Sequence, residues 1–300
     1  MRSVTAVIPT VGRPSLARAV RSVLDQSVEV TELIVVADTK EAVSLPNDER
    51  IRLLCTPFRG GASRCRQLGI DAARGSVIAL LDDDDEWYPE KLERQLQATD
   101  AEPDAHWIAS SRMAVLGPGD RRRIWPRRLI ASGESVPDYL YRFTDLSFGG
   151  ALLQSSTLCF PADLARKVRW DVHADSIHDE PSWLIAVQRA VPDVRLIQLP
   201  DVLGAYHVGT ASLSRDPVDR SQRYIEWGLQ HLSSEPPRVL GDYLCSSPVS
   251  AAVSAGSLDG VRRSVQAALV NGRPGPYAMA YAAMSAVRIV LHTAVAAIRR

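Results

Sequence analysis

Residues 1–100 alternate between short apolar runs and segments in which apolar residues recur at helical spacing. The first helical segment shows this spacing clearly, with Leu16, Ala19, Val20, Val23 and Leu24 on one face. The predicted strands are 4–9, 32–37, 51–55 and 76–81, and the predicted helices begin at Pro14, Gly61 and Pro89. This order predicts a doubly wound, mostly parallel sheet with helices on both faces.

The pattern changes along the rest of the chain. A strand is predicted over 107–116, and the polar, arginine-rich segment 117–128 is expected to form a solvated hairpin. Strand-like runs follow at 152–160 and 194–206, with a helix at 181–190 between them. From residue 217 the chain reads as helices broken at Pro236-Pro237, Gly256 and 272–276. We therefore expect an α/β domain over 1–215 and a helical C-terminal region over 216–300.

One segment of this tail, residues 277–298, is almost entirely apolar or small and is long enough to span a bilayer. Ser285, Arg288 and His292 fall on one side of the predicted helix and form a narrow polar stripe. A charged residue near the middle of a membrane span is costly, so we expect a helix that packs on the protein. A helix on the membrane surface that ends in Arg299-Arg300 is the alternative.

Composition narrows the class of protein. The chain carries 35 basic and 35 acidic residues, so its zero net charge does not indicate a general nucleic-acid binder. The four cysteines lack metal-ligand spacing and fit a reducing compartment. The first apolar run begins at Val4, so we expect no signal peptide and a cytoplasmic protein.

The run Asp82-Asp83-Asp84-Asp85, followed by Glu86, changes this picture most. Like charges repel, so the run gains no stability unless something positive lies beside it. It emerges at the carboxyl end of a predicted strand, the edge at which open α/β sheets bind ligands. Carboxylate oxygens suit a hard cation such as Mg²⁺ or Mn²⁺. A solvated acidic turn ahead of the next helix is the alternative.

Four blocks of sequence resemble the family-2 glycosyltransferases, which have a GT-A fold and invert the anomeric configuration. The most specific block runs from Gly61 through the acidic run to Leu92. The other blocks are 5–13 with 22–27, 33–38 and, more weakly, 178–184. The likeness covers roughly the first two-thirds of the chain. It implies a nucleotide-binding half over 1–100 and an acceptor half over 101–215.

The resemblance implies where a sugar nucleotide binds. The loop containing Pro9, Thr10 and Arg13 would contact the base and ribose, and Asp38 would contact the nucleobase. Thr39-Lys40 departs from the acid-Gly-Ser run that is usual in the family. The alternative roles are a helix cap for Thr10, a surface charge for Arg13 and a turn residue for Asp38.

The resemblance also assigns roles around the acidic run. Arg64 would lie beside the diphosphate or the acidic cluster, with Arg66 as its nearby competitor. In the Asp-x-Asp pattern of the family, Asp82 and Asp84 form the named pair, and Asp83 lies between them. Asp82 would lie near the ribose, and Asp84 would ligate Mn²⁺ or Mg²⁺ through the phosphates.

Inversion requires a carboxylate that takes the proton of the acceptor hydroxyl. The resemblance places Glu180 at the position of this base, with Asp179 as the alternative. His178 and Trp183 would lie on the acceptor side. His207 is displaced from the position at which the family often has a histidine, so we expect it to be structural.

The sequence therefore predicts an enzyme, a metal-dependent inverting glycosyltransferase. It would move a sugar from a nucleoside-diphosphate sugar to a hydroxyl of a glycan, a lipid-linked sugar or a small molecule. A nucleotidyltransferase and a non-catalytic sugar-nucleotide or glycan-binding homologue are the alternatives. We expect no nucleic-acid partner. The C-terminal helix leaves open a peripheral contact with the inner face of the membrane.

Overall fold

The computed structural model describes residues 2–56, 59–100, 106–117, 119, 121–145, 150–172, 177–208 and 218–298, with side chains in the last helix to residue 292. The chain forms two compact units. The first comprises Met1–Val136 and Gly150–Gly209, and the second comprises Pro137–Gly149 and Thr210–Arg300. The expected boundary near residue 215 lies within 209–217, outside the described residues.

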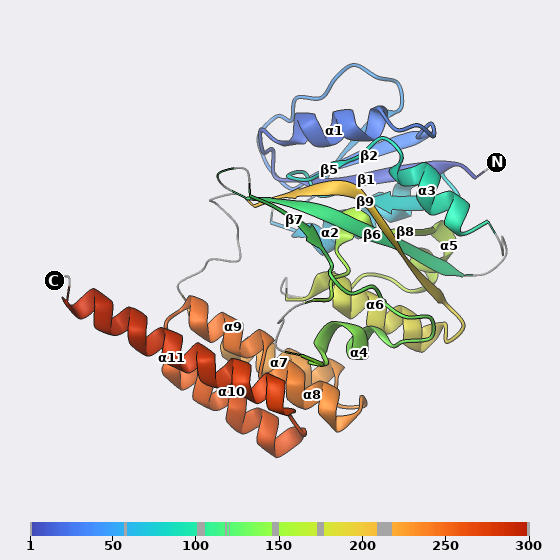
Figure 1. The fold of residues 1–300 in the computed structure, drawn as a ribbon. Helices are drawn as coiled ribbons and strands as arrows, with labels where there is room; N and C mark the ends of the chain where they lie inside the picture. The colour runs from blue at the N-terminus through green and yellow to red at the C-terminus, as the bar shows by residue number, and fades with distance from the viewer. Residues whose placement is uncertain are drawn as a thin grey trace. The chain divides into compact units, whose positions relative to one another are not determined.

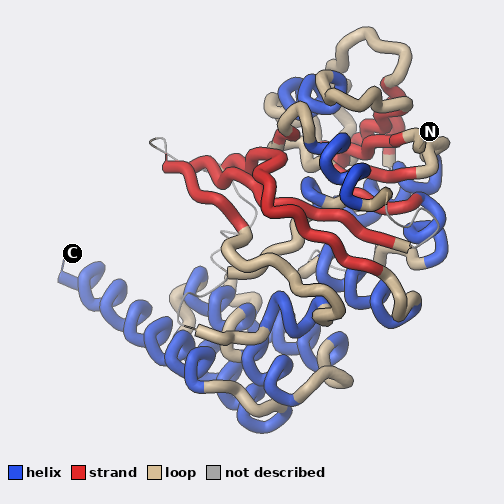
Figure 2. Tube along the Cα trace, turned by 45° about the vertical axis from the view of Figure 1, so that its right-hand side comes forward, coloured by secondary structure: helices blue, strands red, loops and turns tan. Residues whose placement is uncertain are grey.

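The first unit contains a mixed sheet in the order β3-β2-β1-β4-β8-β6-β9-β5, with β7 paired to β6 (Figures 1 and 2). The strands are β1 (Val4–Thr10), β2 (Glu32–Ala37), β3 (Ile51–Cys55), β4 (Val77–Leu80), β5 (Glu86–Trp87), β6 (Trp107–Gly117), β7 (Arg121–Trp125), β8 (Cys159–Pro161) and β9 (Arg195–His207). The helices are α1 (Leu16–Leu24), α2 (Ala62–Ala72), α3 (Lys91–Ala98), α5 (Ala162–Lys167) and α6 (Asp179–Ala190).

The two halves of this sheet differ in strand direction. Strands β3, β2, β1 and β4 are all parallel, as the strand–helix alternation predicted. Beyond β4, β8 is antiparallel to both β4 and β6, and β5 is antiparallel to β9. Strands β6 and β9 are parallel. The sheet is therefore parallel in its first half and mixed in its second.

Helices cover both faces of the parallel half. Ala6 and Ile8 of β1 share a buried cluster with residues of α1, while Val7 points to the opposite face, against α2. A Cβ on Gly69 would lie 2.4 Å from Cγ1 of Val7, so α2 approaches the sheet more closely than any side chain would permit. The predicted α/β class with helices on both faces is confirmed.

Two local predictions in this unit differ from the structure. The strand expected over 152–160 is a 3₁₀ helix, Ser155–Thr157, followed by the short strand β8. Its polar residues form tertiary hydrogen bonds: the hydroxyl of Ser156 donates to Asp85, and that of Thr157 bonds to Ser110. Strand β5 was not predicted, because its two residues acquire strand geometry only by pairing with β9. The expected hairpin is formed by β6 and β7.

The second unit is helical. It contains most of α4 (Val136–Tyr141), together with α7 (Ser221–His231), α8 (Pro237–Leu244), α9 (Ser247–Ser254), α10 (Leu258–Asn271) and α11 (Pro276–Ile298). The predicted helix breaks and the helical C-terminal region are confirmed. In the core of this unit the ring centroid of Tyr141 lies 5.9 Å from that of Trp227 and 4.9 Å from that of Tyr243.

Helix α11 packs through small residues and leaves an apolar face exposed. Ala278, Ala282 and Ser285 are buried, whereas Met284 and Leu291 are 50% and 59% exposed. Ser285, expected in the polar stripe, therefore lies on the packed face. Among the described residues, no helix combines the length and the hydropathy needed to cross a bilayer.

Candidate active site

The acidic run after β4 alternates between buried and accessible carboxylates. Asp83 and Asp85 are 1% and 0% exposed, whereas the side chains of Asp82 and Asp84 are 24% and 44% exposed. Two of the four acids are therefore buried within the protein, and the other two are accessible. The accessible pair is the one that the Asp-x-Asp pattern singled out.

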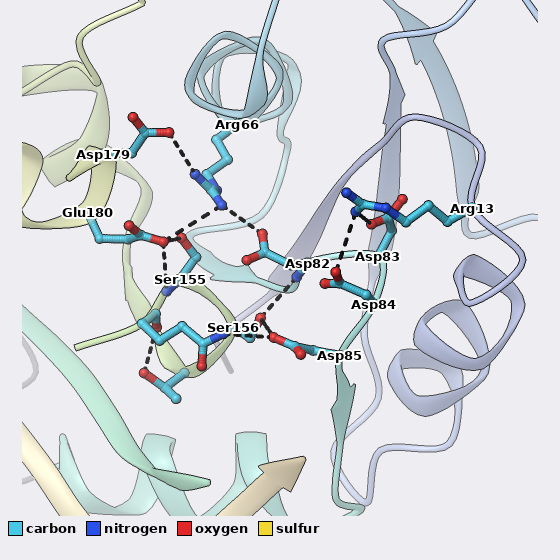
Figure 3. Close-up of polar contacts among 12 residues, drawn as sticks. Arg13, Arg66, Asp82, Asp83, Asp84, Asp85, Ser155, Ser156, Asp179 and Glu180 are labelled. Atoms are coloured by element: carbon cyan, nitrogen blue, oxygen red, sulfur yellow. Dashed lines mark hydrogen bonds and ion pairs between the residues drawn. The ribbon is translucent and has the colours of Figure 1, made fainter. Parts of the chain in front are cut away.

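Asp83 ties the loop after β1 to this turn. Its carboxylate accepts a 2.6 Å hydrogen bond from the hydroxyl of Thr10. It accepts a second one from Arg13 (Figure 3). Arg13 also lies 3.5 Å from an oxygen of Asp84. Burial would lower the pKa of Arg13, but the Asp83 and Asp84 carboxylates outweigh it and the net shift is upward. Thr10 and Arg13, predicted to contact the nucleotide, are thus held at the acidic turn.

Asp85 anchors the turn to the segment before β8. Its Oδ2 accepts hydrogen bonds from the hydroxyl of Ser156 at 2.6 Å and the amide of Gln154 at 2.9 Å. Burial raises the pKa of Asp85 well above its usual value, and the negative charge of Asp82 adds to this. The backbone N–H of Asp82 donates to the same serine hydroxyl at 3.1 Å. The polar run 154–157 was the only sequence signal for this anchor. It was missed because these residues were predicted to belong to a strand over 152–160.

Arg66 on α2 lies between two groups of carboxylates. Its Nη2 is 2.7 Å from Oδ1 of Asp82 and 3.8 Å from Oε1 of Glu180, and its Nη1 is 3.6 Å from Oδ2 of Asp179 (Figure 3). The guanidinium also lies 5.3 Å from the ring centroid of Trp170. Burial opposes its charge, yet Asp82 and Glu180 raise the pKa of Arg66. This buried cation joins the acidic turn to the start of α6.

The acidic pair Asp179-Glu180 forms the first turn of α6, which follows His178 in a left-handed conformation (φ 55°). Oε1 of Glu180 accepts a hydrogen bond from the hydroxyl of Ser155. The side chains of Asp179 and Glu180 are 11% and 21% exposed. Burial and the neighbouring Glu180 charge raise the pKa of Asp179. The two candidate bases therefore differ in environment, and Glu180 is the more accessible.

Residues 5–153 match the model of Glycosyl transferase family 2. These residues belong to glycosyl transferase family 2. Within this family-2 domain, the accessible acids Asp82 and Asp84 follow β4, and Arg66 precedes them on α2.

Two curated bacterial relatives are similar to part of the chain. The amylovoran biosynthesis glycosyltransferase AmsB of Erwinia amylovora is 26% identical over 159 residues, which are 49% of this chain and 51% of the relative. The UDP-Glc:α-D-GlcNAc-diphosphoundecaprenol β-1,3-glucosyltransferase WfgD of Escherichia coli is 36% identical over 87 residues, 27% of this chain and 34% of the relative. The chain spans about half or less of the length of these relatives.

Solved structures of S. aureus TarS share the fold. One has a TM-score of 0.60 at 13% identity and covers 88% of this chain and 49% of TarS. A second, of TarS residues 1–349 in complex with UDP-GlcNAc, has a TM-score of 0.55 at 12% identity and covers 89% of this chain and 81% of that one. At this identity the likeness concerns the fold, and the GT-A-like architecture expected from the sequence is confirmed.

Asp38 of the family-2 domain has an internal role. It accepts hydrogen bonds from the hydroxyl of Thr56 at 2.7 Å and from the backbone N–H groups of Gly60 and Gly61 at 2.8 Å each. Burial would raise the pKa of Asp38, but these donors lower it overall. Asp38 therefore holds the turn that leads into α2, in which Gly61 has φ 80°. Its contact with a nucleobase stays a prediction, as does that of Pro9, a buried residue of β1.

The structure separates other predicted residues from the carboxylates. Arg64 is exposed, and Arg66, two residues later on the same helix, makes the contacts expected of Arg64. Trp183 is 1% exposed, donates its indole N–H to the carbonyl of Val168 at 2.8 Å and stacks on Trp170. It is a core residue rather than part of an acceptor-facing surface. An acceptor contact of His178 stays a prediction.

Tyr206 on β9 is a site residue that the sequence did not indicate. Burial and the charges of Asp85, Asp84, Asp82 and Glu180 raise its pKa, because these carboxylates lie around it. Its neighbour His207 points to the other face, where Nε2 lies 3.8 Å from Oε2 of Glu86. Alternation along the predicted strand was the only available signal for Tyr206.

The donor set fits a divalent cation only in part. Within the described residues, no three His, Cys, Asp or Glu side chains are arranged to hold a metal ion. The protein offers the accessible carboxylates of Asp82 and Asp84, and one oxygen of Asp82 is already bound by Arg66. Hard divalent cations require about six oxygen ligands, so most would come from a bound substrate and water.

Proposed function

We propose that this protein is a metal-dependent inverting glycosyltransferase that moves a sugar from a nucleoside-diphosphate sugar to an acceptor hydroxyl. The observation that carries the proposal is the position of Arg66, which lies between Asp82 at the end of β4 and the Asp179-Glu180 pair of α6. Asp82, which we assign to the donor side, and the pair on α6, which we assign to the acceptor side, both contact this one buried cation. The reaction requires these two groups to flank the anomeric carbon.

In this mechanism Glu180 is the general base. It takes the proton of the acceptor hydroxyl while that oxygen attacks the anomeric carbon from the face opposite the diphosphate. The bond from this carbon to the diphosphate breaks, and its electron pair leaves with the diphosphate. A base must reach the acceptor hydroxyl, and the greater exposure of Glu180, 21% against 11% for Asp179, favours Glu180 for this role.

Asp84, with Asp82 beside it, would hold the Mn²⁺ or Mg²⁺ ion. When bound, the ion supplies Lewis-acid stabilisation of the diphosphate leaving group. Asp82 is held in place by Arg66, and Arg13 lies next to Asp84. These contacts orient the two accessible acids before substrate binds.

The relatives support a sugar-nucleotide donor, since WfgD is named for UDP-Glc and a TarS structure contains UDP-GlcNAc. We place the reaction in the cytoplasm. We also propose peripheral contact with the inner face of the membrane through the exposed apolar face of α11, which includes Met284 and Leu291. Flotation with anionic vesicles tests this contact, and an equal yield of floated protein for wild type and Leu291→Asp would reject it.

The function is tested by incubating the protein with a panel of nucleoside-diphosphate sugars, with Mn²⁺ or with excess EDTA. Release of nucleoside diphosphate only with Mn²⁺ supports a metal-dependent glycosyltransferase. Release of pyrophosphate from nucleoside triphosphate and sugar phosphate would instead indicate a nucleotidyltransferase. A non-catalytic homologue would be stabilised by nucleoside diphosphate and Mn²⁺, by about 2.7 kcal/mol at a hundredfold excess over Kd, without turnover.

A further inference from the structure

The edge strand β7 begins with three consecutive arginines, Arg121, Arg122 and Arg123, and all three side chains are exposed. None of them forms an ion pair with any residue in the described part of the chain. Adjacent like charges repel, so this row contributes nothing favourable to folding by itself. Charged edge strands discourage aggregation, but that role does not depend on which face of the sheet a charge occupies.

The strand register divides the row between the two faces of the sheet. Arg123 pairs with Val115 of β6, which in turn pairs with Tyr206 of β9. Arg122 belongs to the register that continues through β6 to His207. Residues directly opposite one another across strands share a face, and successive residues alternate. Arg121 and Arg123 therefore lie on the face of Tyr206, and Arg122 lies on the opposite face.

The face that carries Tyr206 is the face of the candidate active site. Burial, and then the nearby charges of Asp85, Asp84, Asp82 and Glu180, raise the pKa of Tyr206. Among these acids, Asp82 and Asp84 are accessible. A negatively charged acceptor approaching these acids would be repelled unless positive groups met it on the same face. Arg121 and Arg123 are exposed cations on this face of the sheet.

We propose that Arg121 and Arg123 bind an anionic group of the glycosyl acceptor, either a phosphate or a carboxylate, while its hydroxyl faces Glu180. The proposal rests on the glycosyltransferase function proposed above and adds the charge class of the acceptor. Guanidinium groups bind the oxygens of phosphates and carboxylates through paired hydrogen bonds. Two residues apart on one strand, the two side chains project side by side and can both reach a single extended anion.

The test is calorimetric titration of the full chain at low salt with three probes. These are an alkyl-linked sugar diphosphate, the neutral alkyl glycoside of the same sugar and an oligosaccharide ending in a uronic acid. We expect at least one anionic probe to bind about tenfold or more tightly than the neutral one, since a charge-assisted hydrogen bond contributes about a factor of ten. The tighter of the two anionic probes identifies phosphate or carboxylate as the group recognised.

The matched variants are Arg123→Gln and Arg122→Gln, which remove the same charge from opposite faces of one strand. Arg123→Gln should weaken binding of the anionic probe about tenfold, and the double variant Arg121→Gln/Arg123→Gln should weaken it further. The affinity of Arg122→Gln for the same probe should stay within about twofold of the wild type. An equal loss in Arg122→Gln would overturn the proposal, as would equal binding of neutral and anionic probes. Tighter binding of a single-stranded oligonucleotide or of phosphatidylglycerol vesicles than of either anionic probe would also overturn it.

Donor hydrolysis separates this proposal from the function on which it rests. Release of nucleoside diphosphate to water needs no acceptor, so the double variant should retain the wild-type rate. If the wild-type protein hydrolyses no sugar nucleotide, the proposed function fails, and the titrations still decide whether the two arginines bind anions.

Discussion

At the scale of single residues, the candidate site holds more carboxylates than cations. Arg13 neutralises Asp83, and Arg66 is shared by Asp82, Asp179 and Glu180. Of the two accessible acids, Asp84 is the less compensated, since its contact with Arg13 is 3.5 Å long whereas Asp82 lies 2.7 Å from Arg66. Burial and the charges of Asp82 and Asp83 accordingly raise the pKa of Asp84. The arrangement favours one additional cation at Asp84.

The first prediction concerns Asp84→Asn. Transfer should be abolished, because the proposed metal site loses its main protein ligand. The unfolding midpoint should equal or exceed that of the wild type, because a poorly compensated charge is removed. Turnover and thermal melting are measured together, with the exposed Asp163→Asn as control. Unchanged turnover in Asp84→Asn, or full wild-type activity in EDTA, would contradict the metal assignment.

The second prediction concerns the base. Glu180→Gln should lower turnover by about 10²–10⁴, the usual contribution of general-base assistance. Donor binding should change little, because the donor-side acids are left intact. Asp179→Asn should have a much smaller effect. The reverse order of the two variants would assign the base to Asp179, and a loss of only a few-fold in both would leave α6 without a catalytic base.

The sequence identified the acidic turn and the pair on α6, but not how their charges are compensated. Strand and helix periodicity place residues at a sheet edge, whereas partners are set by contacts between distant segments. Arg66 and Asp179 are 113 residues apart in sequence, and Tyr206 is 91 residues from Val115, its partner on β6. The resemblance assigned the contact with the acidic run to Arg64 with Arg66 as its competitor, and in the structure Arg66 makes it.

At the scale of elements, helix α3 begins with a buried lysine. Lys91 is 1% exposed, donates to Oε1 of Gln95 at 2.8 Å and places its ammonium 4.1 Å from the ring centroid of Trp87. Burial lowers the pKa of Lys91 to about 8. One hydrogen bond and one aromatic face do not replace the hydration of an ammonium, so the charged form is disfavoured in the folded protein.

The third prediction follows from this shift. The folded pKa of Lys91 lies below its unfolded value of about 10.4, so the wild-type free energy of unfolding should rise between pH 8 and about 10.4. Below pH 8 the free-energy cost of burying the charged Lys91 ammonium does not change with pH. In this range Lys91→Met should stabilise the protein by about 1–3 kcal/mol. The advantage should vanish by about pH 10.4. Chemical denaturation at several pH values measures the difference, and a pH-independent difference would contradict the assignment.

Elements formed by local periodicity were predicted, and elements formed by tertiary contact were not. Strands β1 to β4 and helices α1 and α2 follow apolar runs of regular spacing. The 3₁₀ helix Ser155–Thr157 has a strand-like composition around it, but hydrogen bonds to Asp85 and Ser110 fix its shape. No window of sequence contains those partners.

At the scale of the whole molecule, the second unit is assembled from two separate stretches of chain. Asp242 of α8 joins them, since it is 0% exposed and accepts hydrogen bonds from Phe143 N–H at 2.9 Å, Gly275 N–H at 2.7 Å and Nε of Arg238 at 2.9 Å. Its removal would leave these donors unsatisfied in a buried position.

The fourth prediction is that Asp242→Ala destabilises the second unit selectively, by about 3–5 kcal/mol. Calorimetry should show a lowered transition for that unit. Nucleoside diphosphate with Mn²⁺ should stabilise the other transition as it does in the wild type. The exposed Asp259→Ala is the control within the same unit. A uniform loss across both transitions would show that the two units unfold as one.

The split of the second unit also sets an order of events during synthesis on the ribosome. Tyr141 and Phe143 emerge long before their partners Tyr243 and Asp242 have been translated. At about 5–20 residues per second, this interval lasts on the order of 5–20 s. During this interval all strands of the first unit become available to form their sheet, whereas Tyr141 and Phe143 still lack their partners. In nascent chains Tyr141 and Phe143 therefore stay without these partners until α8 has been synthesised.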